Sequence, residues 1–320
     1  MLNVYEKIFL QTKILMTNKK IYLNKASEGW IVDRFRKEWY QNQKEISTKF
    51  IQNSNIIWLI APWTWKKINK KHLKNKKVVC TIHHIDEDKF NGEVKEDFYE
   101  REEYVDIYHA ISKKTEEQLL GLTTKKIETI PFWVNQKIWY QINNKNLIKE
   151  KYKLNKKDYL IGSFQRDTEG DDLISPKLSK GPDQFLEIVK YINDIEKNAH
   201  VILTGKRRGY LIENLKNMKI KYSYYEMVNF KKLNELYNCL DLYIVSSRFE
   251  GGPQAIVECG ISKVPIISTD VGIASNILAK ESIFNMSNYK DATPNINEAY
   301  KNSLPYTIPA GFDNIKKLFQ

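Results

Sequence analysis

The sequence has few cysteines, prolines and glycines and no long hydrophobic run. Three cysteines occur in 320 residues, Cys80, Cys239 and Cys259, each within an apolar segment and without CxxC spacing. They predict reduced core side chains and exclude a disulfide framework or a cysteine zinc site. No apolar run approaches the roughly 18–20 residues needed to span a bilayer. Met1–Lys13 lacks the layout of a signal peptide, so we expect a cytoplasmic protein.

The composition indicates a folded, basic protein. Hydrophobic residues make up 42% of the chain, which is enough for packed cores, and 320 residues correspond to about two domains. Lys and Arg total 51 against 39 acidic residues, a net charge of +12. This charge favours an anionic partner such as nucleic acid, anionic lipid or a phosphorylated ligand, although a solvated lysine-rich surface has the same composition. No helix-turn-helix, RNP or zinc-finger pattern supports nucleic-acid binding.

From about residue 55 the chain alternates short apolar runs with segments of helical periodicity. Nearly all-apolar strands separated by helices predict parallel sheets covered on both faces. A polar stretch, Gln141–Glu150, interrupts the pattern. The expected strands are Asn55–Ala61, Val78–His83, Asp106–Ile111 and Ile127–Phe132 before it, and Tyr159–Phe164, Ala199–Thr204, Lys221–Tyr225, Leu240–Val245 and Val264–Ser268 after it.

This alternation predicts two Rossmann-like α/β domains joined near residue 145. Open α/β sheets bind ligands at the carboxyl ends of their strands, and two such domains predict a ligand in a cleft between them. Near the N-terminus, Glu28–Gln43 places Trp30, Phe35 and Trp39 near helical spacing, which favours a packing face over a binding stripe. Helices are expected in the second domain over Pro182–Ile195, Tyr210–Met218, Phe230–Cys239 and Pro253–Ser262.

The segment SSRFEGGPQAIVE, residues 246–258, is the most informative one. It follows an expected strand and opens an expected helix. Gly251 and Gly252 lack Cβ and allow a ligand to approach the backbone, while Pro253 suits the first helical turn. The free N–H groups and the dipole of the helix form an anion site suited to phosphate. Glu250 and Glu258 can accept hydrogen bonds from vicinal hydroxyls, but the same residues are also common on loops and helices.

The spacing of these residues resembles the signature of the retaining glycosyltransferases of family 4, which have the GT-B fold. Three further elements resemble the family in the same order. DIYHAIS and IPFWVN, beginning at Asp106 and Ile130, are similar to its last acceptor-domain strands. Arg166 and Lys180 are similar to its phosphate-binding pair, and Asp270–Gly272 to its strand-loop-glycine element. The resemblance is specific over residues 155–280 and weak before residue 55.

The resemblance implies a role for each matching residue. Glu258 would bind the ribose of a nucleotide-sugar, and Glu250 would contact hydroxyls of the transferred sugar. Arg166 and Lys180 would hold the diphosphate and stabilise its developing charge, which is a role that fixed cations can perform. No metal or other cofactor is then needed. The resemblance also implies a catalytic role for His83. The remaining donor-binding residues would be Gly251, Gly252, Pro253 and Gly205.

Two features of the first domain bear on partners. His83 follows the strand VVCTI, where the family has a cleft-lining histidine; a core or surface histidine is the alternative. Lys66–Lys77 holds seven lysines in twelve residues, beside Trp63 and Trp65. Basic and aromatic surfaces of this kind are attracted to anionic leaflets, and a solvated helix face is the alternative. The long segment between Arg166 and Lys180 departs from the family pattern.

The sequence therefore predicts a GT-B glycosyltransferase with a cytoplasmic or peripheral-membrane location. Residues 1–145 would form the acceptor-binding domain, with the helix 305–320 packing back on it, and residues 146–304 the donor domain. The donor would be a nucleotide-diphosphate sugar, the acceptor a saccharide or a lipid-linked saccharide, and the product a polysaccharide or glycoconjugate of retained configuration. The alternatives are a nucleotide-sugar epimerase of the same fold, or a basic nucleic-acid-binding protein.

Overall fold

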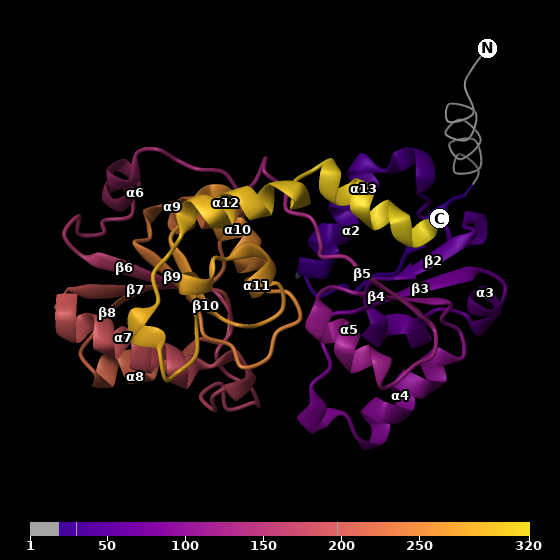
Figure 1. The fold of residues 1–320 in the computed structure, drawn as a ribbon, viewed down its shortest axis with the longest axis horizontal. Coiled ribbons are helices and arrows are strands. Elements are labelled where there is room, and N and C mark those ends of the chain that lie inside the picture. The colour runs from indigo at the N-terminus through magenta and orange to yellow at the C-terminus, as the bar shows by residue number, and fades with distance from the viewer. Residues whose placement is uncertain (1–18, 30, 197) are drawn as a thin grey trace, which may run out of the picture. The chain divides into compact units, whose positions relative to one another are not determined.

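A computed structural model describes residues 19–29, 31–196 and 198–320. Met1–Lys13 and Trp30, which enter the sequence predictions above, lie outside the described residues. The chain divides into two compact units. Unit 1 comprises Met1–Ile130 with Phe312–Gln320, and unit 2 comprises Pro131–Gly311. Each unit is an α/β structure with one parallel sheet (Figure 1).

Unit 1 contains a five-stranded parallel sheet in the order β1-β2-β3-β4-β5. The four strands expected in this half are present, and the additional β1 has only three residues in a segment without clear periodicity. All four residues of β2 are buried, because helices cover both faces of the sheet. The strands are β1 (Ile21–Leu23), β2 (Ile56–Leu59), β3 (Lys77–Ile82), β4 (Ile107–Ala110) and β5 (Lys126–Thr129).

The helices of unit 1 pack on opposite faces of this sheet (Figure 1). On one face, Trp39 contacts Trp58 of β2 with ring centroids 5.2 Å apart, and Phe312 and Phe319 pack against Trp39 at 5.8 and 5.7 Å. Phe35 and Trp39 are fully buried, which confirms the predicted packing face. The helices are α2 (Ile31–Asn42), α3 (Lys70–Lys74), α4 (Gly92–Glu102), α5 (Lys113–Leu120) and α13 (Ala310–Lys316).

Unit 2 contains a six-stranded parallel sheet in the order β11-β10-β9-β6-β7-β8. The first strand along the chain, β6, lies between β7 and β9, so the direction of winding reverses between β6 and β9. In an open α/β sheet this reversal opens a crevice at the carboxyl ends of the two strands. The strands are β6 (Tyr159–Ser163), β7 (Ala199–Thr204), β8 (Lys221–Tyr225), β9 (Leu242–Val245), β10 (Ile266–Thr269) and β11 (Ile283–Phe284).

The helices expected in unit 2 are present, with ends that differ by a residue or two. α10 begins at Gln254, so Pro253 is its N-cap residue and not its first helical residue. The expected boundary near residue 145 falls inside unit 2, because Ile142 N–H donates to Asn238 Oδ1 at 2.7 Å and Trp139 is buried in the unit 2 core. The helices are α6 (Lys145–Lys151), α7 (Pro182–Glu196), α8 (Gly209–Asn217), α9 (Phe230–Cys239), α10 (Gln254–Ser262), α11 (Ala274–Ile277) and α12 (Ile296–Ser303).

Three predictions based on absences can be compared with the described residues. The cysteines at 80, 239 and 259 are free and fully buried, as expected of core side chains. Among residues 19–29, 31–196 and 198–320, no helix combines the length and apolar character that crossing a bilayer requires. The same residues contain no group of three or more His, Cys, Asp or Glu side chains placed to hold a metal ion.

Candidate functional site

Two loops meet at the reversal point of the unit 2 sheet, one after β6 and one after β9. Gly181, at the end of the first loop, has φ +60°, and a Cβ there would lie 1.7 Å from Ser246 O. Ser246 Oγ donates to Gly181 O at 2.8 Å. The backbone N–H groups of Arg248 and Phe249 both donate to Ser179 O, at 2.9 and 3.1 Å. Only glycine permits this approach, which joins the loops along their length.

The joined loops bring Lys180 and Glu250 into contact. Lys180 Nζ donates to Glu250 Oε1 in a short ion pair, and both side chains are largely buried. Ser247 Oγ lies 3.4 Å from the same carboxylate oxygen and 3.3 Å from Gln165 Oε1. The family resemblance implies that the lysine binds phosphate and the glutamate binds sugar. In this structure the two side chains form an ion pair, so a ligand that binds both would have to separate them.

Arg166 lies on the loop after β6 and is half buried. Within the described part of the chain it makes no hydrogen bond or ion pair. The neighbouring Asp167 is buried and pairs with the buried Arg208, with Nε to Oδ2 at 2.9 Å. Arg208 also donates to Ser163 O, at 2.9 Å. This pair anchors the segment between Arg166 and Lys180, and leaves Arg166 as a cation available to a ligand.

The Asp167–Arg208 pair was not predicted from the sequence. Burial raises the pKa of Asp167 to about 6, although Arg208 and the backbone N–H groups at the start of α8 act in the opposite direction. Burial also lowers the pKa of Arg208. In the sequence, Asp167 begins an acidic run and Arg208 stands in a basic one, which is typical of a surface loop. Nothing in either run signals that the two side chains meet in the interior.

Glu258 is a buried carboxylate on α10. Its side chain accepts a hydrogen bond from Tyr237 Oη at 3.2 Å, and the residue is only 5% exposed. The pKa of Tyr237 is raised by burial, by Tyr243 and by this carboxylate. Glutamate is rarely buried unless it is paired or functional. This burial argues against an ordinary solvated helix position.

Aromatic rings line the interior beside Glu258. Phe164, directly after β6, packs edge-on against Tyr237 at 4.6 Å and Tyr243 at 5.3 Å. Gly205 follows β7 with φ +85°, and a Cβ there would have Phe164 O at 3.6 Å as its nearest contact. The predicted donor-binding glycine therefore lies at the same sheet edge as Phe164, in a conformation that favours glycine.

Gly251 and Pro253 pack against the strand-loop-glycine element. Gly272 has φ +57°, and a Cβ there would lie 2.7 Å from Gly251 O and 2.8 Å from Pro253 Cδ. Gly251 and Pro253 are themselves buried, while Gly252 between them is partly exposed. The backbone of residues 251–253 is therefore held at the start of α10, where helix N–H groups attract anions.

His83 belongs to unit 1 and follows β3. Its Nε2 lies 2.9 Å from Ile60 O, and since a carbonyl only accepts, Nε2 carries the proton. Burial lowers the pKa of His83 to about 4. The ring is therefore neutral near pH 7, with Nδ1 as its acceptor atom. His109, one strand further, is fully buried and bonds Ile130 O and Thr81, as a structural histidine does.

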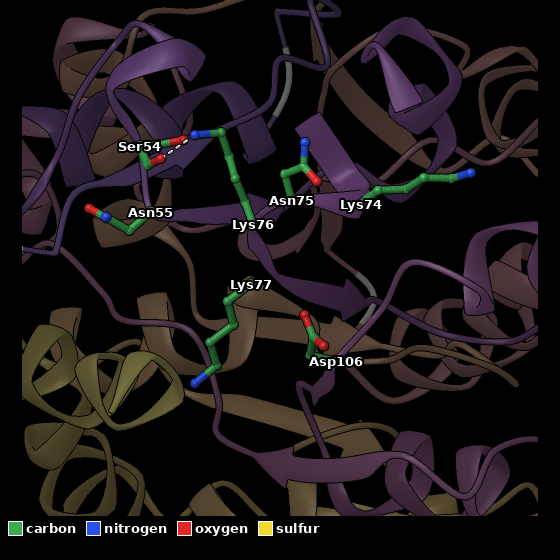
Figure 2. Close-up of a pocket in the computed structure, with 7 residues that line it drawn as sticks. All are labelled: Ser54, Asn55, Lys74, Asn75, Lys76, Lys77 and Asp106. Carbon is green, nitrogen blue, oxygen red and sulfur yellow. Dashed lines mark hydrogen bonds between the residues drawn. The ribbon is translucent and has the colours of Figure 1, made fainter. Parts of the chain in front are cut away.

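The lysine cluster Lys66–Lys77 is divided in the structure. Lys66 pairs with Asp97 and Glu100 at 3.0 Å each, and Lys70 pairs with Glu100 at 2.9 Å. The other end of the cluster lines a cavity of about 600 Å³ at the amino ends of β2, β3 and β4. Figure 2 shows its lysine side chains pointing in different directions, with the ammonium group of Lys76 turned to Ser54. The cavity therefore lacks convergent cations.

Comparisons with known proteins give a family-model match within unit 2 and a fold. The family model described as glycosyl transferases group 1 matches residues 174–300, which lie within unit 2. No curated protein matches the chain. HepE from Anabaena, solved with UDP and glucose, has a TM-score of 0.72 at 9% identity, covering 94% of this chain and 99% of that one.

Two further structures share the fold. A TarM mutant of S. aureus, solved with fondaparinux, α-GlcNAc-glycerol and UDP, has a TM-score of 0.61 at 16% identity, covering 84% of this chain and 56% of that one. Sucrose-phosphate synthase from Thermosynechococcus elongatus has a TM-score of 0.59 at 14% identity, covering 90% and 73%. The chain has two Rossmann-like units and matches GT-B glycosyltransferase structures, which confirms the predicted fold class. At identities of 9%, 16% and 14%, these structures show the fold.

The buried histidines predict an acid-sensitive fold. The pKa values of His83 and His109 are both lowered to about 4 by burial, against about 6.5 for a free imidazole. Between these values the unfolded chain binds protons that the folded chain does not, so the free energy of unfolding falls as pH falls. Asp167 has the opposite effect: its pKa is raised to about 6, so its protonation below pH 6 raises the free energy of unfolding.

We expect His83→Gln to reduce this pH dependence, because the amide can still donate to Ile60 O but does not titrate. Between pH 6.5 and 5 the variant should lose roughly 1–2 kcal/mol less unfolding free energy than the wild type. Urea denaturation followed by circular dichroism at each pH measures the difference. Identical slopes would mean that His83 is protonated equally in both states.

Proposed function

We propose that this chain is a glycosyltransferase that moves a sugar from a nucleotide-diphosphate sugar to an acceptor hydroxyl. The observation that carries the proposal is the contact between Lys180 and Glu250 at the reversal point of the unit 2 sheet, with Arg166 on the same loop as Lys180. Buried Glu258 lies on the helix that begins at the same edge. The group 1 family match over residues 174–300 supports the assignment independently.

The donor is proposed to bind at the carboxyl ends of β6 and β9. Its diphosphate would occupy the start of α10 and contact Arg166, which makes no ion pair within the described residues. On donor binding, the ion pair between Lys180 and Glu250 would break, and Lys180 would bind phosphate oxygens. The released Glu250 would accept hydrogen bonds from sugar hydroxyls. Glu258 would accept from the ribose hydroxyls. UDP-sugars are the first donors to test, since Anabaena HepE was solved with UDP-glucose.

The proposed reaction retains the anomeric configuration and transfers a hexose. The acceptor oxygen attacks the anomeric carbon on the face that the diphosphate leaves. The bond from that carbon to the diphosphate breaks, and a diphosphate oxygen takes the acceptor proton. Arg166 and Lys180 stabilise the charge that grows on the diphosphate, so we propose that no divalent metal is required. Unit 1 is proposed to hold the acceptor, with neutral His83 accepting from one of its hydroxyls.

Glu258→Ala should weaken the binding of UDP, because the ribose hydroxyls lose a charged acceptor. A hydrogen bond to a charged group contributes about 1.5–3 kcal/mol, so affinity should fall by about tenfold or more. Isothermal calorimetry with UDP measures this change. Glu213→Ala, at an exposed position of α8, is the matched control and should bind as the wild type does. Equal affinity for the Glu258 variant would remove it from the donor site.

Arg166→Gln and Lys180→Gln should lower turnover by about a hundredfold, by analogy with loss of one donor to a developing oxyanion. Turnover is measured as UDP released from UDP-glucose, with and without EDTA. Lys216→Gln, exposed on α8, should leave the rate unchanged. Normal turnover in folded Arg166 and Lys180 variants would contradict the mechanism. Loss of wild-type activity in EDTA, restored by magnesium or manganese, would contradict the proposal that no divalent metal is required.

We also propose peripheral association with an anionic membrane through the exposed part of Lys66–Lys77, near a lipid-linked acceptor in polysaccharide or glycoconjugate synthesis. Lys67, Lys71 and Lys74 are exposed and make no ion pair among residues 19–29, 31–196 and 198–320. Each lysine near an anionic leaflet contributes about 1 kcal/mol, and salt screens the attraction. Carboxylates of α4 already neutralise Lys66 and Lys70, so these three should dominate.

Replacing the three exposed lysines by Gln should reduce co-sedimentation with phosphatidylserine vesicles by about a hundredfold in affinity at low salt. The control replaces Lys190, Lys216 and Lys219 by Gln, which removes the same charge from exposed positions of unit 2. Equal losses in both variants would indicate a response to net charge alone. Absence of vesicle binding in the wild type would leave the cluster as a solvated surface.

A further inference from the structure

Unit 1 contains a second cavity, at the carboxyl ends of β2 and β3. It has a volume of about 570 Å³ and lies between the turn Pro62–Lys67, the loop after β3, and α4. Its apolar wall includes Ile85 and Phe98, which are buried. The volume is within the range of about 300–1,000 Å³ found for small-molecule sites. The carboxyl edge is also where open α/β sheets bind ligands.

Trp63 forms one wall of this groove and is held in a defined orientation. Its indole Nε1 donates to Glu28 Oε1 at 2.7 Å. The ring of His83 packs against it at 5.7 Å, and His83 is itself held by Ile60 O. Trp63 is nevertheless 48% exposed. A large aromatic ring that is both exposed and fixed can bind a flat apolar surface without losing further conformational freedom.

The charges around the groove cancel. Lys66, Lys89 and Arg101 line it together with three carboxylates, and His84 is the remaining titratable lining residue. The three carboxylates are Asp86, Glu93 and Asp97.

Ion pairs join most of these groups. Asp97 pairs with Lys66 at 3.0 Å and with Arg101 at 3.1 Å, and Lys89 lies 3.9 Å from Asp86. In a chain of net charge +12, this groove is formally neutral. Glu93 makes no ion pair with any residue that the structure describes, so its carboxylate can accept hydrogen bonds from a ligand.

We propose that this groove binds the sugar ring of an uncharged acceptor, with the ring stacked on Trp63. One face of a pyranose carries C–H groups that pack on an aromatic ring, while its hydroxyls donate to carboxylates such as Glu93. A phosphorylated or uronic-acid acceptor is anionic, and the groove has no excess of cations to bind it, because its three carboxylates balance its three cations. The proposal rests on the proposed function, because it names the acceptor class of that transferase.

The neutral groove also distinguishes this role from membrane insertion of Trp63. If the Trp63 indole entered a leaflet, the neighbouring side chains would come close to the lipid headgroups. These neighbours include the carboxylates of Glu28, Asp86 and Glu93. These carboxylates offset the cations of the groove, so an anionic leaflet has no net attraction for it. The hydrogen-bonded indole N–H and the carboxylate-lined groove therefore fit a hydroxylated ligand better than a lipid surface.

Saturation-transfer NMR on the full-length protein tests the proposal. The probes are the methyl glycosides of glucose, galactose, mannose and N-acetylglucosamine, compared with glucuronic acid and glucose 1-phosphate. At least one neutral glycoside should bind, and Trp63→Ala should weaken it tenfold or more, while Trp63→Phe keeps part of the affinity. Phe50→Ala, at a 66% exposed aromatic of unit 1 outside the groove, is the matched control and should change nothing.

A second variant tests the charge argument. Glu93→Lys gives the groove an excess of cations and should admit glucose 1-phosphate, which the wild-type groove rejects. Sugar bound at the donor site would not respond to either groove substitution. Failure of every neutral glycoside to bind, binding that Trp63→Ala leaves unchanged, or rejection of glucose 1-phosphate by the Glu93 variant would each overturn the proposal.

Calorimetry with UDP on the same samples separates this proposal from the proposed function. UDP binding without glycoside binding would contradict the acceptor groove alone. Trp63-dependent glycoside binding without UDP binding would contradict a transferase that uses UDP-sugars, while the groove would remain a carbohydrate site. Thermal unfolding of each variant checks that unit 1 remains folded.

Discussion

The candidate site depends on the close contact between Gly181 and Ser246. With φ +60° and no room for a Cβ, residue 181 brings the end of the β6 loop against the end of β9. Arg248 extends the contact through a bidentate ion pair with Asp183, with N–O distances of 2.7 and 2.6 Å. Lys180 and Glu250 stand on either side of this contact, so their pairing follows from the backbone approach. Displacement of the loops by a side chain at residue 181 would separate the pair.

A buried ion pair supports the other end of the same loop. Asp167 and Arg208 connect the β6 loop to the start of α8, and Arg208 also binds the last residue of β6. A buried pair contributes little net stability, but loss of one partner leaves an isolated charge in the interior. Its effect here is therefore positional. It fixes the backbone next to Arg166, whose own side chain makes no ion pair with any described residue.

Much of the fold could be predicted from the sequence, because buried parallel strands are apolar throughout and loops are polar. β1 was not predicted because three residues are too few for a periodic pattern. At the site, the resemblance to family 4 glycosyltransferases indicated Lys180, Glu250 and Glu258, but not that the first two neutralise each other. Such pairing depends on the distance between loops 70 residues apart in the chain. The Asp167–Arg208 pair also could not be predicted, since burial of a charged residue leaves no local sequence signal.

The two candidate sites arrange their charged side chains differently, in a chain of net charge +12. At the candidate site of unit 2, Arg166 makes no ion pair with any described residue, and Lys180 is held by one carboxylate that an anionic ligand can displace. In unit 1, three carboxylates balance the three cations that line the groove beside Trp63. A nucleotide-diphosphate sugar and an uncharged saccharide both carry hydroxyls, so hydrogen bonding alone would not distinguish them. The arrangement of the charges does: the first site offers a diphosphate Arg166 and the N–H groups at the start of α10, while carboxylates balance the cations of the second site. Under the proposed function, each unit would thus select its own substrate without any contribution from the overall charge of the protein.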